Sequence, residues 1–296
     1  MSPDPRRPRL PAFVLNPHRG RGETAALKAR LRRVRLHTVC ESARCPNLVE
    51  CFRRPTAAFL ILGNRCTRGC GFCAVAAGAP LQPSADEPAA VAEAAAELGL
   101  THVVVTSVTR DDLADGGAAQ FAAVIRAVHG RLPGARVEAL VPDFGGSESA
   151  LATVMAARPD VLNHNLETVP RLYPRVRPGA DYGRSLELLA RAAAMGGGRA
   201  LVKSGLMVGM GEEREEVIAV FRDLVAAGCG LVTVGQYLQP RRDRLPVARY
   251  WAPEEYGELE RAARELGLRI FAGPLVRSSY LADRAFRGGG DTGPGD

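Results

Sequence analysis

Residues 58–73, AFLILGNRCTRGCGFC, contain the two features that decide the fold. The first five residues of this stretch are apolar without interruption, as in a strand that is buried on both faces. The polar segment that follows places Cys66, Cys70 and Cys73 at C-x3-C-x2-C spacing. We therefore expect a strand whose carboxyl end runs directly into a loop of three thiols.

The alternation of apolar runs and helical stretches continues along the chain. Five further apolar runs are candidate strands: 103–106, 137–141, 161–163, 201–207 and 231–235. Six stretches with apolar residues at every third or fourth position are candidate helices: 88–98, 117–130, 149–157, 183–195, 212–227 and 253–266. Glycines follow four of these helices, where carboxyl-terminal caps are expected.

This pattern predicts an α/β fold with a parallel sheet covered by helices. Both an open doubly wound sheet and a barrel fit the alternation itself. Polar or glycine-rich stretches follow nearly every strand, at 64–73, 107–112, 142–146, 164–168, 209–212 and 236–239. Functional groups from six strand ends converge most simply at the mouth of a barrel. We therefore expect a partial (β/α)6 barrel over residues 58–272.

Composition and charge narrow the class of protein. The chain has 296 residues, of which 46% are hydrophobic and 24% charged, which excludes collagen-like, coiled-coil and wholly disordered proteins. No apolar run approaches the roughly 20 residues of a membrane helix, and the N-terminus lacks the apolar core of a secretion signal. We expect a cytoplasmic protein that is not bound to a membrane.

Residues 1–36 form a basic N-terminal arm. They hold ten Arg and Lys residues against two acidic residues, so this arm accounts for the whole net charge of +7. Such an arm is compatible with a solvated segment, with nucleic acid or with an acidic protein partner. The low aromatic content, 5%, and the lack of a binding motif beside the charge argue against nucleic acid. A glycine-rich tail at 287–296 is expected to be disordered.

Six of the seven cysteines fall within 34 residues, and Cys229 stands alone. Without a secretion signal, clustered cysteines favour metal over disulfides. Cys66, Cys70 and Cys73 can bind three corners of an iron–sulfur cube, so that one iron has no protein ligand. An open metal position can chelate a substrate. A zinc site that a distant His or Cys completes is the alternative.

The loop resembles the cluster-binding loop of the radical S-adenosylmethionine (SAM) superfamily, since Phe72 takes the aromatic position before the third cysteine. The resemblance implies that the open iron binds the amino and carboxylate groups of SAM. An electron from the cluster then cleaves SAM to methionine and a 5′-deoxyadenosyl radical, which abstracts hydrogen from an unactivated carbon.

A second triad, Cys40, Cys45 and Cys51, has C-x4-C-x5-C spacing in residues 37–57. Six ligands cannot share one cube, so this separate spacing indicates a second cluster. The alternative is a structural zinc site with His37 as its fourth ligand.

Seven motifs in order resemble those of the lipoyl synthase family, and the resemblance covers about residues 34–285. The motifs lie at 36–51, 59–75, 106–112, 164–169, 203–208, 235–240 and 273–280. This chain differs from the family at two places. Arg244 stands where the family commonly has histidine, and the stretch before Leu36 is shorter than in the family. Neither difference affects a cluster ligand, so they bear on the docking of partners and not on activity. The resemblance implies two [4Fe-4S] clusters, the radical-generating one and an auxiliary one.

The auxiliary cluster needs a fourth ligand beside its three thiolates. In the family the second serine of an Arg-Ser-Ser-Tyr motif supplies it, which assigns the role to Ser279 in the C-terminal segment 273–286. A serine oxygen is a poorer partner for iron than thiolate, which suits a cluster that must be taken apart. The resemblance implies that this cluster gives two sulfurs to carbons 6 and 8 of an octanoyl chain, with two SAM consumed.

The same resemblance directs attention to polar residues at the predicted mouth. Asn165 and Glu167 occupy alternate positions after a strand, so both can face one cavity, where a carboxylate suits ribose hydroxyls. A surface ion pair is the alternative for Glu167. The candidate SAM contacts are Phe72, Ser107, Asn165, Glu167, Arg177, Lys203 and Gln236. For Ser107 the alternative is a helix cap, and for Arg177 a solvated side chain.

The expected partners follow from the resemblance. They are an octanoylated lipoyl carrier domain, from a dehydrogenase-complex subunit or the glycine-cleavage carrier, and an electron donor such as flavodoxin or ferredoxin. Another radical SAM sulfur-inserting enzyme, a two-cluster electron-transfer protein and a zinc-stabilised binding module remain as alternatives. A whole barrel with polar groups at six strand ends argues against an electron carrier.

Overall fold

A computed structural model describes residues 9–15, 36–53 and 56–279. Its centre is a sheet in which seven strands run parallel, and the six predicted strands are all present. They are β2 (Thr56–Ile61), β5 (His102–Ser107), β6 (Arg136–Leu140), β7 (Val161–Asn163), β8 (Leu201–Val208) and β9 (Leu231–Gln236). The α/β class is confirmed.

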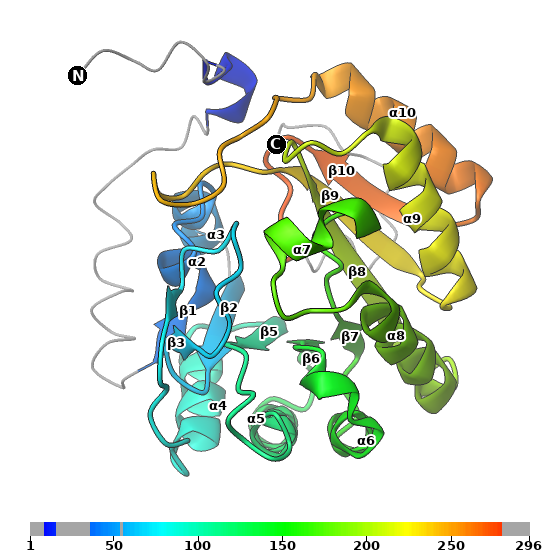
Figure 1. Cartoon of the computed structure of the whole chain (residues 1–296). Helices are drawn as coiled ribbons and strands as arrows, with labels where there is room; N and C mark the ends of the chain where they lie inside the picture. The colour runs from blue at the N-terminus through cyan, green and yellow to red at the C-terminus, as the bar shows by residue number, and fades with distance from the viewer. Residues whose placement is uncertain (1–8, 16–35, 54–55, 280–296) are drawn as a thin grey trace.

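Two edge strands extend the predicted sheet. β1 (His37–Thr38) pairs antiparallel with β2, and β10 (Arg269–Gly273) pairs parallel with β9. The order is β1-β2-β5-β6-β7-β8-β9-β10, so over the described ranges the sheet does not close on itself. The curved sheet and its open side agree with a partial barrel (Figure 1). β10 was missed because its apolar run is only three residues long.

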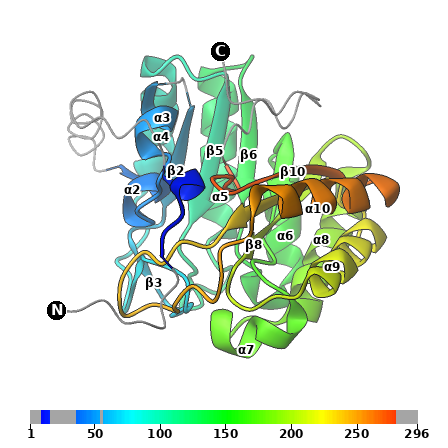
Figure 2. The same ribbon diagram turned by 90° about the horizontal axis from the view of Figure 1, so that it is seen from above.

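Six long helices cover the outer face of the sheet, as predicted (Figures 1 and 2). They are α4 (Glu87–Glu97), α5 (Ala118–Arg131), α6 (Glu148–Ala156), α8 (Tyr182–Gly196), α9 (Arg214–Ala226) and α10 (Pro253–Glu265). Local capping sets several of their ends: the Ser147 hydroxyl accepts from Ala150 N at the start of α6, and the Asp181 carboxylate accepts from Arg184 N at the start of α8.

The two faces of the strands differ in chemistry. Outward positions such as Val105 pack with helix residues such as Phe121, both fully buried, in one hydrophobic core. Because side chains alternate along a strand, the intervening positions face the interior of the barrel. Several of these interior positions are polar or charged and nearly inaccessible to solvent: His102, Thr106, Glu138, Asn163, Lys203 and Thr233.

Short elements surround the open side of the sheet. The N-terminal part contributes η1 (Ala12–Val14), α2 (Val39–Ser42) and α3 (Leu48–Arg53). β3 (Arg65–Cys66) and β4 (Ala76–Ala77) pair beside β2, and η2 (Phe144–Gly146), η3 (Pro170–Leu172) and α7 (Tyr173–Val176) follow β6 and β7. Most of the basic arm and the glycine-rich tail lie outside the described residues. Among those that are described, no helix is both long and apolar enough to cross a membrane.

Candidate active site

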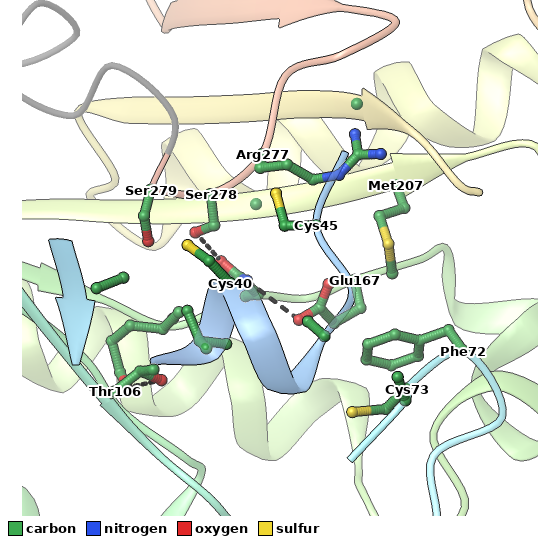
Figure 3. A pocket seen from close by; sticks show the side chains of 18 of the residues that line it. Cys40, Cys45, Phe72, Cys73, Thr106, Glu167, Met207, Arg277, Ser278 and Ser279 are labelled. Atoms are coloured by element: carbon green, nitrogen blue, oxygen red, sulfur yellow. Dashed lines mark hydrogen bonds between the residues drawn. The ribbon is translucent and has the colours of Figure 1, made fainter. Parts of the chain in front are cut away.

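One cavity of about 790 Å³ occupies the mouth and interior of the barrel (Figure 3). All six clustered cysteines line it, together with Ser279. The cysteines come from two segments, α2–α3 and the loop after β2, and Ser279 comes from the chain that follows β10. The fold therefore brings both predicted triads and the predicted serine ligand to one space.

The first triad lies on the loop between β2 and β4. The Cys66 thiol accepts two backbone N–H hydrogen bonds, from Thr109 at 3.3 Å and from Arg68 at 3.4 Å. Burial raises the pKa of Cys70 to about 11 and also raises the pKa of Cys73. Burial therefore favours the protonated form of both thiols, and metal binding, which requires the thiolate, would release these protons.

An arginine inside this loop anchors it to the barrel. The Arg68 guanidinium donates two hydrogen bonds to the Asp111 carboxylate, at 2.8 and 2.7 Å, and two to the Asp143 carboxylate, at 3.0 and 2.8 Å. Burial opposes ionisation of Asp143, but Arg68 outweighs it and lowers the pKa of Asp143 to about 2. The loop between Cys66 and Cys70 is therefore fixed by two bidentate ion pairs.

The second triad lies on α2, α3 and the turn between them. A hydrogen bond between the Cys40 and Cys45 thiols raises the pKa of Cys40 and lowers that of Cys45 to about 6, assisted by the positive charge of Arg277. Figure 3 shows the Arg277 side chain extending over Cys45. Burial lowers the pKa of this arginine. A partly buried cation thus faces the cysteines that the family resemblance assigns to the auxiliary cluster.

The donor sets fit iron–sulfur clusters. Each triad offers three thiols to the cavity, and Ser279 offers an oxygen to the same space. Over the described part of the chain, no three His, Cys, Asp or Glu side chains are arranged to hold a single metal ion.

Asn165, Glu167 and Arg177 form a connected group on the cavity wall. The Asn165 amide donates to the Glu167 carboxylate at 3.1 Å, and Arg177 Nη1 donates to the Asn165 carbonyl at 2.8 Å. Glu167 has a φ of 68°, a left-handed conformation that is rare outside glycine and common at functional sites. Burial raises its pKa, and Arg177 opposes that rise. Arg177 is 9% exposed, so the alternative of a solvated side chain is wrong.

The other candidates differ in how far they reach the cavity. Phe72 and Ser107 line it, and the Ser107 hydroxyl is buried without a hydrogen-bond partner among the described residues. Gln236 also lines it, but its amide is engaged with the backbone of the following loop: Oε1 accepts from Trp251 N at 2.9 Å, and Nε2 donates to Arg249 O at 3.1 Å. Lys203 is not part of the lining, because its ammonium lies behind it, against Glu138 and Ser278.

Sequence reasoning missed a histidine on the cavity wall. His164 is 1% exposed, its Nδ1 lies 2.8 Å from the Val141 carbonyl, and its Nε2 has no partner among the described residues. Burial, with the charge of Arg177, lowers the pKa of His164 to about 4, so the ring is neutral at pH 7. Its place one residue after a strand and directly before Asn165 was the available signal. Cys229, which stands apart from the two triads in the sequence, is buried.

Comparisons with known proteins agree with this geometry. The model of the Radical SAM superfamily matches residues 60–224. Curated lipoyl synthases are similar over most of the chain: the protein from Rubrobacter xylanophilus is 53% identical over 86% of this chain and 80% of its own, and that from Oleidesulfovibrio alaskensis is 58% identical over 83% and 84%.

Solved structures share the fold at low identity. The [FeFe]-hydrogenase maturase HydG from Carboxydothermus hydrogenoformans has a TM-score of 0.59 at 17% identity, over 79% of this chain and 56% of its own. Methylornithine synthase has a TM-score of 0.55 at 15% identity, over 73% and 70%. The electron-carrier and zinc-module alternatives do not account for the match to curated lipoyl synthases.

Proposed function

The chain belongs to the lipoyl synthase family of the radical SAM superfamily, and from that premise we propose that it inserts two sulfur atoms into an octanoyl-lysine of a lipoyl carrier domain. The sulfurs replace hydrogens on carbons 6 and 8. The observation that carries the proposal is the presence of both cysteine triads and Ser279 on the wall of one cavity.

Cys66, Cys70 and Cys73 are the ligands we assign to the radical-generating [4Fe-4S] cluster. When bound there, this cluster supplies an electron for the cleavage of SAM, which yields the radical that removes hydrogen. The chain contributes a fixed loop: Arg68 anchors it, and backbone N–H groups of Arg68 and Thr109 stabilise the negative charge of the Cys66 sulfur.

Cys40, Cys45, Cys51 and Ser279 are the ligands we assign to the auxiliary cluster, which is consumed as the source of sulfur. Three soft thiolates and one hard oxygen make an uneven set for iron. The partly buried cation of Arg277 stabilises the thiolate form of Cys45.

Polar groups between the two triads are suited to SAM. We assign the ribose hydroxyls to Asn165 and Glu167 and the amino group to the unpartnered Ser107 hydroxyl. Arg177 holds the turn that carries Asn165 by donating to its carbonyl, and Phe72 packs beside the cavity. Gln236 shapes the wall through its loop contacts.

Apolar side chains from several elements also line the cavity, including Leu10, Val39, Leu140 and Met207. A wall of this kind suits a saturated acyl chain and excludes water from a radical. Leu10 lies in the N-terminal segment, so residues outside the barrel complete the wall.

The partners are assigned on chemistry. The substrate is an octanoylated carrier domain, either a dehydrogenase-complex subunit or the glycine-cleavage carrier, and the reductant is a flavodoxin or ferredoxin. We propose that the basic arm, residues 1–36, attracts an acidic carrier.

We further propose that segments 37–57 and 273–286 are extensions of the barrel at 58–272. The protein works in the reducing cytoplasm, where thiols stay reduced.

The test is anaerobic reconstitution of both clusters followed by reaction with SAM, a reductant and an octanoyl-lysyl carrier peptide. Mass spectrometry should show a product with two sulfurs in place of two hydrogens, and two 5′-deoxyadenosines per product. Formation of 5′-deoxyadenosine without sulfur insertion would contradict the assigned substrate or the auxiliary cluster.

A further inference from the structure

Four neighbouring strands form a buried polar cluster in the barrel interior, in which His102 lines the cavity and Glu138, Asn163 and Lys203 lie behind its wall. Glu138 on β6 accepts hydrogen bonds from Lys203 Nζ on β8, at 2.9 Å, and from Asn163 Nδ2 on β7, at 2.8 Å. His102 Nε2 on β5 lies 3.4 Å from the same carboxylate. All four residues are 3% exposed or less. A buried ion pair costs desolvation energy, and replacing it by apolar residues is often neutral, so its presence calls for a role.

This cluster holds the residue that precedes Ser279. Lys203 Nζ donates to the Ser278 carbonyl at 2.7 Å, and Asn163 Nδ2 donates to the Ser278 hydroxyl at 2.8 Å. The Ser278 hydroxyl in turn donates to Asn165 Oδ1 at 2.9 Å. Two strands of the barrel therefore bind both the backbone and the side chain of one residue in the C-terminal segment.

The barrel wall is shaped to admit this segment. A Cβ at Gly235 of β9 would lie 2.0 Å from the Val276 carbonyl oxygen, so only glycine leaves room for the chain there. On the N-terminal side, Asn47 Nδ2 donates to the Leu275 carbonyl at 2.6 Å. Residues 275–278 are thus held at one end by segment 37–57, which carries Cys40, Cys45 and Cys51, and at the other end by the barrel interior.

We propose that Lys203 and Asn163, oriented by Glu138, are positioning residues that hold Ser279 in place as the oxygen ligand of the auxiliary cluster. The inference rests on the proposed function, because it assigns a purpose to the Ser279 ligand. The motif suggested Lys203 as a contact of SAM, whereas the proposal assigns it to the positioning of a ligand of the auxiliary cluster. The Lys203 ammonium and the Glu138 carboxylate form an ion pair, so together these two side chains carry no net charge.

The test compares the reconstituted wild type with Lys203→Met and with the neutral pair Lys203→Met/Glu138→Gln, which removes both charges together and avoids an unpaired buried carboxylate. Tyr182→Phe is the matched control, since it removes a hydrogen bond of 2.7 Å to Asp223 in the outer helix layer. Ser279→Ala is the reference for loss of the ligand.

Three readouts separate positioning from general damage. The Mössbauer signature of the auxiliary cluster should change in the Lys203 variants in the direction seen for Ser279→Ala, and hydrogen exchange of the peptide that contains 275–279 should become at least tenfold faster. The lipoyl product formed per 5′-deoxyadenosine should fall at least tenfold, with 5′-deoxyadenosine formation within twofold of wild type. Tyr182→Phe should change none of these three readouts. Adding Lys203→Met to Ser279→Ala should have no further effect on the signature.

The outcomes distinguish the two proposals. If Ser279→Ala alters the signature and both Lys203 variants keep the wild-type signature and exchange rate, the positioning role is refuted and the proposed function stands. If Ser279→Ala leaves the signature unchanged, Ser279 is not a ligand of the auxiliary cluster, and the positioning role of Lys203 and Asn163 is refuted as well.

Discussion

Gly235→Ala should disable sulfur insertion although it adds one methyl group. The new Cβ would lie 2.0 Å from the Val276 carbonyl oxygen, whereas real Cβ contacts shorter than 3.0 Å are essentially absent from proteins. Either β9 or the segment that carries Ser279 must therefore move by about 1 Å. β9 is hydrogen-bonded on both sides, to β8 and β10, so the C-terminal segment is the part that yields.

The expected magnitude follows from that displacement. Misplacement of a reacting group by about 1 Å can cost roughly 100-fold in rate. Overpacking of this kind also destabilises the fold, by about 1–3 kcal/mol. We expect sulfur insertion to fall about 100-fold. The formation of 5′-deoxyadenosine, which we assign to the first triad, should stay within a few-fold of wild type.

The assay is a single-turnover reaction with an octanoyl-lysyl peptide, in which lipoyl product and 5′-deoxyadenosine are counted by mass spectrometry. Gly257→Ala is the matched control, because it makes the same change in α10 where no atom lies within 4 Å of the new Cβ. This control should leave activity unchanged and raise stability by about 0.5–1 kcal/mol, as alanine does in a helix. A Gly235→Ala enzyme with wild-type sulfur insertion would refute the argument from close approach.

Three further predictions concern the first triad and the cavity wall. Cys66→Ala should remove about half of the reconstituted iron and abolish 5′-deoxyadenosine formation, and an iron count equal to wild type would contradict the two-cluster assignment. The pKa of Asp143 is lowered from 3.8 to about 2, which adds about 2 kcal/mol of stability. This contribution is present above pH 4 and is lost as the pH falls towards 2. Denaturant titrations of Asp143→Asn should therefore lack this acid-dependent loss of stability. His164, with its pKa lowered to about 4, should show a neutral imidazole in NMR spectra at pH 6, and a ring that titrates near 6.5 would contradict its burial.

Much of the architecture followed from local sequence patterns. Apolar runs predicted the six inner strands, because a strand that is buried on both faces is apolar without interruption. Three- to four-residue periodicity predicted the six outer helices, because each helix buries one face against the sheet. The edge strands β1 and β10 were missed because two residues and a three-residue apolar run are too short to show a period.

The chemistry was also partly local. Thiol spacing within residues 66–73 and 40–51 predicted two metal-binding segments, since ligands of one site that lie close in sequence keep a fixed spacing. Alternation correctly directed Asn165 and Glu167 to one cavity, but their hydrogen bond and the left-handed backbone of Glu167 depend on contacts with β8 and Arg177.

The sequence by itself determined the class of fold and the two thiol triads, because these depend on periodicity and spacing along the chain, and it indicated the family through the resemblance of seven short motifs. Only the tertiary structure decided the position of Lys203, which the motif suggested lies with SAM and which the fold places against Glu138 and Ser278. The residues concerned are 65 and 75 positions from Lys203 in the chain. These contacts form because the curved sheet places β6 and β8 around one interior and the C-terminal segment returns into that interior. Contacts between residues so far apart in the chain leave no signal in local periodicity or spacing.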